Sequence, residues 1–378
     1  YGTLSELKGS VLKVAQMLSM DKGVLPSAYT DQFAQAQYKA PPLSGPLIVK
    51  TFRQFFGKSP LDLFDEFEME AAHAASIGQV HRAKVDGKDL AIKIQYPGVG
   101  DSVVSDLNIV RPIARRMFGW KDSEIAVYFE EVQERLLEET DYQLELQRSM
   151  EISQKTADLP NLVFAKYYPE YSAERIIAMD WLDGLHLDQF LATNPSQEIL
   201  NQAGQALWDF YNYQVHTLKL MHADAHPGNF LFWEDGRVGI LDFGCVKAIP
   251  QTFYENYFAL IQPGILENDT EFTKRLRGAG MILDSDSAAE QEKYKGIFKE
   301  ALGLMCKPFY ADQFDFGDEG YFGEVYAYGE KMGRSPEMRQ SAPRGDKDGI
   351  YMNRAYFGLF SILNQLKAKV ETRRYMPA

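Results

Sequence analysis

Cysteine is scarce in this sequence, and long apolar runs are lacking. Among its 378 residues are only two cysteines, Cys245 and Cys306, which provide no disulfide framework and therefore indicate a reducing compartment. No apolar run approaches the roughly 20 residues that a membrane-spanning helix needs, and no signal peptide is recognisable. We therefore expect the protein in the cytoplasm, or in the mitochondrial matrix of a eukaryote, with any membrane contact peripheral and local.

Positive charge is also in short supply. The chain has 40 Lys and Arg against 53 Asp and Glu, a net charge of −13, which argues against nucleic acid as a partner because that partner requires a cationic surface. Residues 1–60 reverse this balance, with seven basic and three acidic side chains. This basic segment is either a solvated helix face or an extension that docks on an acidic part of the protein or on a membrane.

Apolar periodicity divides the chain into helical and strand-like segments. We predict helices over residues 1–40 and 46–56 and over the acidic stretch 123–150, and a mainly helical chain after residue 185. Six strands are predicted, four of them in two hairpins with Asp-Gly turns: 77–85 with 88–95, 229–233 with 237–241, and the further strands 162–168 and 175–181.

The order of these segments suits an α+β, bilobal fold like that of protein kinases. We expect a helical N-terminal extension over residues 1–56, an N-lobe with a small antiparallel sheet over 57–182, and a mainly helical C-lobe over 183–378. A hinge is expected near Trp181–Gly184, so Trp181 and Leu182 are predicted to contact a bound nucleotide. The aromatic clusters in 309–328 and 351–360 are interpreted as core packing in preference to a lipid groove.

The strongest chemical signal is a short loop sequence that carries an aspartate and an asparagine. Asp224 and Asn229, in H-A-D-A-H-P-G-N, have the D-x-x-x-x-N spacing of a phosphotransferase catalytic loop. Asp224 can orient an attacking hydroxyl or water, and the amide oxygen of Asn229 can bind Mg²⁺. The predicted hairpin then brings Asp242, in L-D-F-G, back as a second oxygen ligand, which suits this hard cation.

Two similar patterns are weighed against this one. Asp315-Phe316-Gly317 is a second D-F-G, but we predict no strand before it and find no suitable D-x-x-x-x-N, so we interpret it as structural. The spacing His222-x-Asp224-x-His226 also resembles that of zinc hydrolases. The presence of Lys93, Asn229 and Asp242 favours phosphoryl chemistry over zinc.

Lys93 is the predicted phosphate-binding lysine. In the strand L-A-I-K-I-Q it lies on the face opposite Leu90 and Ile92, where it can point into a cleft. The alternative is a solvent-facing lysine. The acidic helix favours the first interpretation, because Glu145 lies four residues after Asp141 on one helical face and can pair with Lys93.

Together these motifs resemble the UbiB/ADCK (AarF-type) family of atypical kinases, the ubiquinone-biosynthesis kinase-like proteins. The resemblance covers most of residues 5–250 and rests on six elements in order: L-K-V-A-Q at 12–16, A-A-S-I-G-Q-V-H at 74–81, A-I-K at 91–93, E-T-D at 139–141, the H-x-D-x-H-P-G-N segment and L-D-F-G. Residues 251–378 match only loosely.

The resemblance implies roles for particular residues. Lys13 and Gln16 fit the family's K-x-G-Q signature on an extension that covers the peptide site of protein kinases, with Glu139 and Asp141 as its acidic partners. The alanine-rich loop that replaces a glycine-rich nucleotide loop corresponds to residues Ala74, Ala75 and Ser76. Two departures are Ala15, where the signature has Gly, and Ala225, where many members have Pro.

We therefore expect an atypical kinase that binds ATP and Mg²⁺ and hydrolyses ATP in support of ubiquinone or isoprenoid-lipid biosynthesis. Its expected partners are the nucleotide and a hydrophobic small molecule or enzymes of quinone synthesis. Two alternatives stay open. One is a non-catalytic, nucleotide-dependent lipid-binding scaffold, and the other is a kinase that phosphorylates an unidentified small molecule or protein. Docking of the basic extension on the acidic helix, through Lys13 and Gln16, is favoured over a solvated face.

Overall fold

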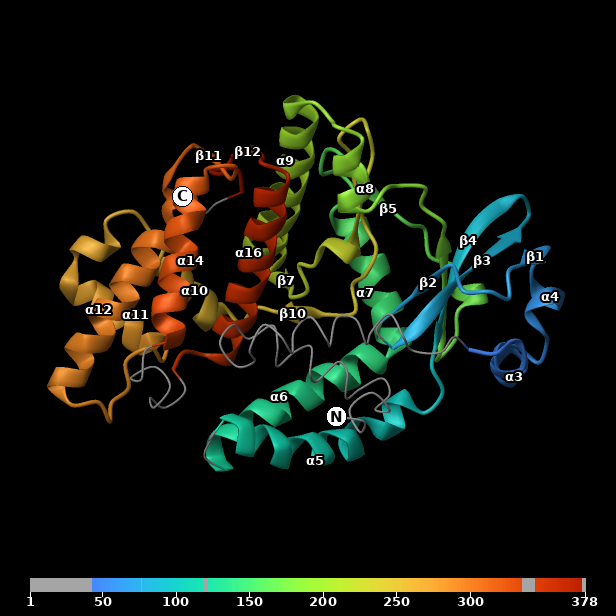
Figure 1. Cartoon of the computed structure of the whole chain (residues 1–378), viewed down its shortest axis with the longest axis horizontal. Coiled ribbons are helices and arrows are strands. Elements are labelled where there is room, and N and C mark those ends of the chain that lie inside the picture. Colours follow the sequence, from blue (N-terminus) through green and yellow to red (C-terminus); the bar gives the residue numbers. More distant parts are fainter. Residues whose placement is uncertain (1–42, 76, 119–121, 335–343, 376–378) are drawn as a thin grey trace. The chain divides into compact units, whose positions relative to one another are not determined.

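The computed structural model describes residues 43–75, 77–118, 122–334 and 344–375 (Figure 1). It divides into two compact units, each described by itself. Unit 1 contains the described residues up to Ile152 together with Ala165–Leu182 and Asp242–Cys245, and unit 2 contains the remainder. The helices predicted over residues 1–40 lie outside the described residues, so the division into extension, N-lobe and C-lobe stays a prediction. Within the described ranges, no helix has the length and apolar character needed to cross a membrane.

Unit 1 contains one antiparallel sheet in the order β1-β3-β4-β6, with β2 paired to β3. The predicted hairpin of β3 and β4 is confirmed, and both turn residues, Asp86 and Gly87, have positive φ (50° and 72°). Lys93 on β4 lies opposite Val80 on β3 and Ile177 on β6. The strands are β1 (Glu66–Phe67), β2 (His73–Ala74), β3 (Gly78–Val85), β4 (Lys88–Gln95) and β6 (Ile176–Asp180).

The two faces of this sheet differ in the way the alternating sequence predicts. Leu90, Ile92 and Ile94 pack in one core with Ile48 and Phe52 of helix α3 (Gly45–Phe56), the helix predicted over 46–56. Helix α4 (Pro60–Leu63) follows α3 and contacts both α3 and β1. Lys93 lies on the opposite face of this sheet.

Three α-helices are described between β4 and β6 within residues 99–118 and 122–155, where one was predicted over 123–150. They are α5 (Val99–Phe118), α6 (Asp122–Thr140) and α7 (Tyr142–Lys155), and α5 and α6 lie side by side in Figure 1. The predicted single helix is wrong because Asp141 interrupts it. The Asp141 carboxylate accepts a hydrogen bond from the backbone N–H of Leu144 (2.9 Å), which caps a new helix at this point.

Unit 2 contains the second predicted hairpin, β8 (Phe230–Phe232) and β9 (Val238–Ile240), and its Gly236 has φ 82°. The strand predicted over 162–168 is shorter, β5 (Leu162–Phe164), and it pairs in parallel with β9. Two further ladders were not predicted, since three-residue strands carry little periodicity. They pair β7 (Leu220–His222) with β10 (Val246–Ala248), and β11 (Gln313–Asp315) with β12 (Lys369–Glu371).

Most of the remaining described residues of unit 2 are helical. Helix α9 (Gln197–Tyr213) contributes Trp208, whose ring packs against Phe309, Phe316 and Phe360 (centroid distances 5.6–6.3 Å). These contacts confirm that the aromatic clusters largely form core. The other helices are α8 (Leu187–Ala192), α10 (Gln251–Ala259), α11 (Asp269–Gly278), α12 (Ala288–Met305), α13 (Lys307–Tyr310), α14 (Glu319–Arg334) and α16 (Lys347–Gln365).

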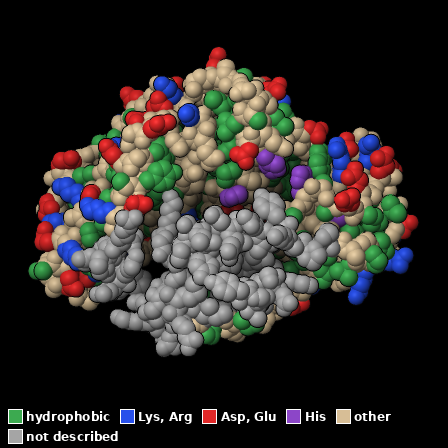
Figure 2. Space-filling model, viewed as in Figure 1, with side chains coloured by type: hydrophobic (Ala, Val, Ile, Leu, Met, Phe, Trp, Pro, Cys, Tyr) green, Lys and Arg blue, Asp and Glu red, His purple; other side chains and the backbone are tan. Residues whose placement is uncertain are grey.

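Charged side chains of both signs are intermingled over the surface of unit 2 near α11 and α12 (Figure 2). Many of them are paired: Lys295 with Asp269 (3.0 Å) and Glu292 (2.8 Å), and Arg275 with Glu271 (2.7 Å). Most of these carboxylates are well exposed, and exposed pairs of this kind contribute little to stability.

Two glycines of α14 offer a test of this helix. A Cβ added at Gly323 or Gly329 meets no atom within 4 Å, and both residues are exposed. We expect Gly323→Ala and Gly329→Ala each to raise the free energy of unfolding by about 0.5–1 kcal/mol, because alanine loses less conformational entropy in a helix. The measurement is urea-induced unfolding. The control, Gly204→Ala in α9, should destabilise because its Cβ would overlap the Cβ of Ala368; equal effects at all three positions would contradict the argument.

Candidate functional site

Lys93 of β4 lies at the centre of a buried charge cluster in unit 1. Its ammonium is 2.7 Å from Oε1 of Glu145 on α7 and 3.2 Å from Oδ2 of Asp242. The side chains of Lys93 and Glu145 are 10% and 5% exposed, whereas that of Asp242 is 38% exposed. The structure thus brings together three residues that lie up to 149 positions apart in the chain.

Burial dominates the electrostatics of this cluster. It raises the pKa of Glu145 to about 7, although the nearby Lys93 ammonium opposes the rise. Burial by itself would lower the pKa of Lys93, but the carboxylates of Asp242 and Glu145 outweigh it and hold that pKa well above its usual value. Lys93 therefore stays cationic, and burial brings the pKa of Glu145 close to neutral pH.

Asp242 is held by a turn of its own. Its Oδ1 accepts a hydrogen bond from the backbone N–H of Gly244 (2.7 Å), and the Phe243 side chain between them is fully buried. A side chain at Gly244 would place its Cβ 3.0 Å from that same oxygen, so glycine permits the close turn. The carboxylate is fixed, with Oδ2 directed to Lys93.

Asp224 and Asn229 lie in unit 2, on the loop between β7 and β8. The Asn229 side-chain N–H donates to the backbone oxygen of Asp224 (2.9 Å) and to its Oδ2 (3.1 Å), which leaves the amide oxygen of Asn229 as a ligand atom. His222, before the loop, is buried, and its Nδ1 accepts weakly from the Asp224 N–H (3.4 Å). The predicted spacing therefore does bring Asp224 and Asn229 into contact.

Comparison with known proteins decides the family. Residues 35–276 match the ABC1 atypical kinase-like domain, which is more than half of the chain. The chain belongs to the ABC1 atypical kinase-like family. It is 28% identical over 322 residues to Protein ACTIVITY OF BC1 COMPLEX KINASE 8, chloroplastic, of Arabidopsis thaliana (78% of this chain, 42% of the relative). It is 24% identical over 376 residues to Atypical kinase COQ8B, mitochondrial, of Danio rerio (98% of this chain, 58% of the relative).

This ABC1 chain thus spans about half the length of these two curated relatives. A similar solved structure is that of Rv3197 from Mycobacterium tuberculosis in complex with erythromycin, with a TM-score of 0.68 and 25% identity over 99% of this chain and 92% of that one. The predicted α+β, kinase-like fold is confirmed by these matches.

The acidic residues expected to receive the extension of the ABC1 chain lie at the junction of α6 and α7. Glu139 is in the last turn of α6 and is partly buried, whereas Asp141 is exposed and caps α7. The neighbouring Glu138, which was not predicted, pairs with Arg148 (3.1 Å). Lys13 and Gln16 lie outside the described residues, so the docking of the extension stays a prediction.

The predicted nucleotide-contacting residues lie toward opposite ends of the unit 1 sheet. The alanine-rich loop precedes Gly78, which pairs with Gln95 at the end of β4. Trp181 and Leu182 follow β6, and the Trp181 N–H donates to the oxygen of Asp89 near the start of β4 (3.0 Å). Ala74 ends β2, and the backbone N–H of Ala75 donates to the Gly78 oxygen (2.9 Å), which closes the loop; Ser76 lies outside the described residues. Leu182 packs against the core that includes Ala91 and Met179. The Trp181 ring stacks on His73 (5.8 Å) and lies 4.8 Å from the Arg82 guanidinium.

Sequence reasoning missed three residues around Lys93. Val80 and Met179 share its sheet face, as the strand register shows, and could have been found by pairing the predicted strands. Tyr142 was overlooked, although it precedes Glu145 by three residues and therefore lies on the same helical face. Its ring centroid is 5.1 Å from the Lys93 ammonium.

The two competing patterns have structural settings of their own. A strand, β11, does lead into Asp315, which corrects the expectation that none precedes the second D-F-G. Asp315 repeats the turn of Asp242 by accepting from the Gly317 N–H (2.8 Å), but its partner is the exposed Lys369 (2.9 Å). Among the described residues, no group of three or more His, Cys, Asp and Glu side chains could hold a metal ion.

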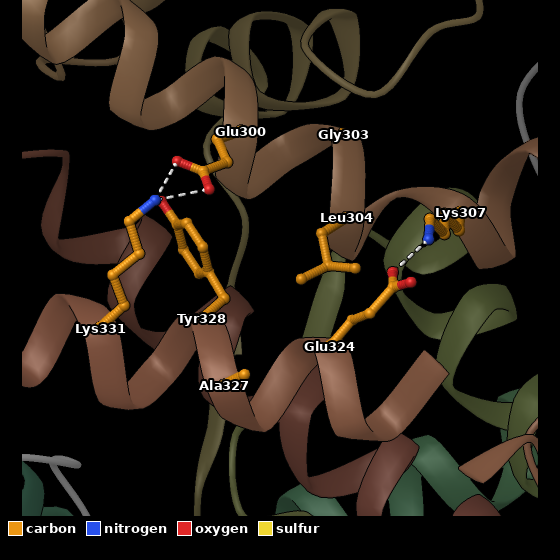
Figure 3. A pocket seen from close by; sticks show the side chains of 8 residues that line it. All are labelled: Glu300, Gly303, Leu304, Lys307, Glu324, Ala327, Tyr328 and Lys331. Carbon is orange, nitrogen blue, oxygen red and sulfur yellow. Dashed lines mark hydrogen bonds and ion pairs between the residues drawn. The ribbon is translucent and has the colours of Figure 1, made fainter. Parts of the chain in front are cut away.

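An open pocket of about 470 Å³ is lined by residues of α12, α13 and α14 in unit 2 (Figure 3). Its ends carry two ion pairs across the helices, Glu300 with Lys331 (2.7 Å) and Glu324 with Lys307 (2.7 Å). Tyr328 lines its wall and donates its hydroxyl to the Ile297 oxygen (3.0 Å). The residues that line it are distinct from every predicted site residue.

Proposed function

We propose that this ABC1 domain binds Mg·ATP and hydrolyses it. The observation that carries the proposal is the buried cluster of Lys93, Glu145 and Asp242 within unit 1. A lysine held by one buried and one partly exposed carboxylate is the arrangement by which kinases position nucleotide phosphates and metal. Glu145 fixes the ammonium, and Asp242 remains accessible to a ligand.

Each of the two predicted magnesium ligands, taken by itself, offers an oxygen atom of the kind that Mg²⁺ prefers. Asp242 offers a carboxylate oxygen that is partly exposed, and Asn229 offers an amide oxygen that its hydrogen bonds to Asp224 leave available. Mg²⁺ prefers hard oxygen ligands and also binds phosphate oxygens and water. The ion supplies charge neutralisation at the phosphates when bound. Within this proposal Lys93 binds a phosphate, and Asp224 orients the attacking hydroxyl or water.

The proposed biological role is based on the names of two relatives. One relative is named Atypical kinase COQ8B, mitochondrial, and another is named Protein ACTIVITY OF BC1 COMPLEX KINASE 8, chloroplastic. With the UbiB/ADCK resemblance of the motifs, this supports a role in ubiquinone or isoprenoid-lipid biosynthesis. A hydrophobic small molecule or an enzyme of that synthesis is the proposed partner.

The test compares the two D-F-G segments. Asp242→Asn should reduce ATP turnover at least on the order of a hundredfold, because it weakens both the metal ligand and the contact to Lys93. Asp315→Asn is the matched control, since it alters the same tripeptide with the same turn, and it should leave turnover unchanged. Phosphate release from Mg·ATP measures both variants and the wild type.

Two results would count against the proposal. Equal turnover in the wild type and Asp242→Asn would remove Asp242 from the chemistry. Binding of Mg·ATP without any turnover in the wild type would favour the non-catalytic, nucleotide-dependent scaffold.

A further inference from the structure

Tyr142 is buried beside the lysine of the proposed site, and its role is not explained by the charge cluster. It opens α7, its side chain is fully buried, and its ring lies 5.1 Å from the Lys93 ammonium. The Lys93 ammonium interacts with the face of the Tyr142 ring. This contact does not involve the hydroxyl at the far end of the ring.

That hydroxyl has no hydrogen-bond partner among the described residues. A buried polar group left unpaired costs about 1–3 kcal/mol, so each such group in a native structure needs a physical explanation. Burial also raises the pKa of Tyr142, which keeps the hydroxyl protonated as a donor. What it lacks in the described chain is an acceptor.

The hydroxyl lies against the point where the alanine-rich loop ends. A Cβ built on Gly78, the first residue of β3, would be 2.8 Å from the Tyr142 oxygen and would overlap the Ile94 backbone oxygen. Gly78 also closes the loop by accepting the Ala75 N–H (2.9 Å). Glycine at this position therefore lets the loop backbone approach the tyrosine closely, and the donor lies at the base of the loop.

We propose that the Tyr142 hydroxyl donates a hydrogen bond to a phosphate oxygen of the bound nucleotide. This inference rests on the proposed function. A phosphate is the chemistry that fits, because it brings several strong acceptors and a negative charge to a place that already holds the Lys93 ammonium. Tyr142 is then a phosphate-contacting residue beside Lys93, and its unpaired hydroxyl is satisfied only in the complex.

The experiment uses Tyr142→Phe, which removes the oxygen alone. We expect affinity for Mg·AMP-PNP to fall about ten- to one-hundredfold, as for loss of a hydrogen bond to a charged group. Affinity for adenosine, which has no phosphate, should not change. The midpoint of thermal unfolding without nucleotide should stay equal or rise, because an unpaired buried hydroxyl is removed. Calorimetric titration and thermal unfolding measure these quantities.

Tyr321→Phe is the matched control, since Tyr321 of unit 2 also has a buried hydroxyl without a partner in the described chain. It should match Tyr142→Phe in thermal stability and leave nucleotide affinity unchanged. If the wild type binds Mg·AMP-PNP and Tyr142→Phe binds it equally, this inference is wrong and the proposed function stands. If Tyr142→Phe lowers the unfolding midpoint and weakens adenosine as much as Mg·AMP-PNP, the hydroxyl is structural. If the wild type binds no nucleotide, the proposed function fails and this inference with it.

Discussion

Replacing Lys93 with Met is expected to lower the free energy of unfolding by about 3–5 kcal/mol and to abolish nucleotide turnover. The stability loss follows because Glu145, 5% exposed, would keep a buried carboxylate without its cation. Turnover is lost because the proposed phosphate ligand is removed. Urea-induced unfolding and phosphate release measure the two effects.

A double variant separates the two effects. Lys93→Met combined with Glu145→Gln removes both buried charges, and Asp242, at 38% exposure, remains solvated. We expect the double variant to recover most of the stability, since a buried ion pair is often replaced by neutral groups at little cost. Turnover should stay absent. Recovery of turnover in the double variant would contradict the role of Lys93.

The stability of the wild type and of these variants is expected to depend on pH in different ways. The pKa of Glu145 is about 7 in the folded protein against an ordinary value of 4.5. Between these values the folded state binds more protons at this site than the unfolded state, so the contribution of Glu145 to stability is lost as the pH rises through this window. In Lys93→Met the loss should extend to higher pH, and in Glu145→Gln it should be absent. Parallel stability profiles from about pH 5 to pH 8 would contradict this assignment.

The parts of the fold that the sequence predicts are those with local signals. The hairpin around Asp86-Gly87 and the one around 234–236 have turn residues that require positive φ and strands with alternating apolar positions. The break at Asp141 was missed because an aspartate within an acidic helical pattern looks like one more surface charge. Only the hydrogen bond to the Leu144 N–H makes it a cap.

In the candidate site, too, the residues that were predicted are those with a local sequence signal. Glu145 was predicted through its spacing from Asp141 on one helical face, and the contact with Lys93 is indeed present. Tyr142 could not be identified as important from the sequence, because its significance lies in an unpaired hydroxyl and in the approach of Gly78, which belongs to another element. Periodicity and spacing in a sequence predict which residues of one helix or strand lie on the same face. They do not predict which buried polar atoms lack a hydrogen-bond partner.

Gly358 of α16 packs closely against the loop that carries Asp224, as Gly78 does against Tyr142. A Cβ at Gly358 would overlap the Ala225 backbone oxygen and lie 2.6 Å from its Cβ. The helix cannot retreat easily, since Leu359 is fully buried and the Tyr356 hydroxyl donates to Asn212 (3.0 Å). Gly358→Ala therefore has to displace the loop.

We expect Gly358→Ala to lower kcat for ATP hydrolysis about ten- to one-hundredfold, because small displacements of a catalytic group have effects of this size. Overpacking should also cost about 1–3 kcal/mol of stability. The affinity for Mg·AMP-PNP should fall less than kcat, since Lys93 and Asp242 belong to unit 1 and only Asn229 among the proposed ligands lies on the displaced loop. Steady-state kinetics and calorimetric titration separate kcat from binding.

Gly349→Ala, on the same helix, is the control, because its Cβ would make an ordinary contact with Phe253 at 3.6 Å. It should leave kcat unchanged. Adding Ala225→Gly to Gly358→Ala removes one of the two overlaps, so part of the lost kcat should return. If both alanine variants reduce kcat equally, or if Ala225→Gly restores nothing, the loss stems from the helix itself. The position of Asp224 would then depend on contacts other than the one between α16 and Ala225.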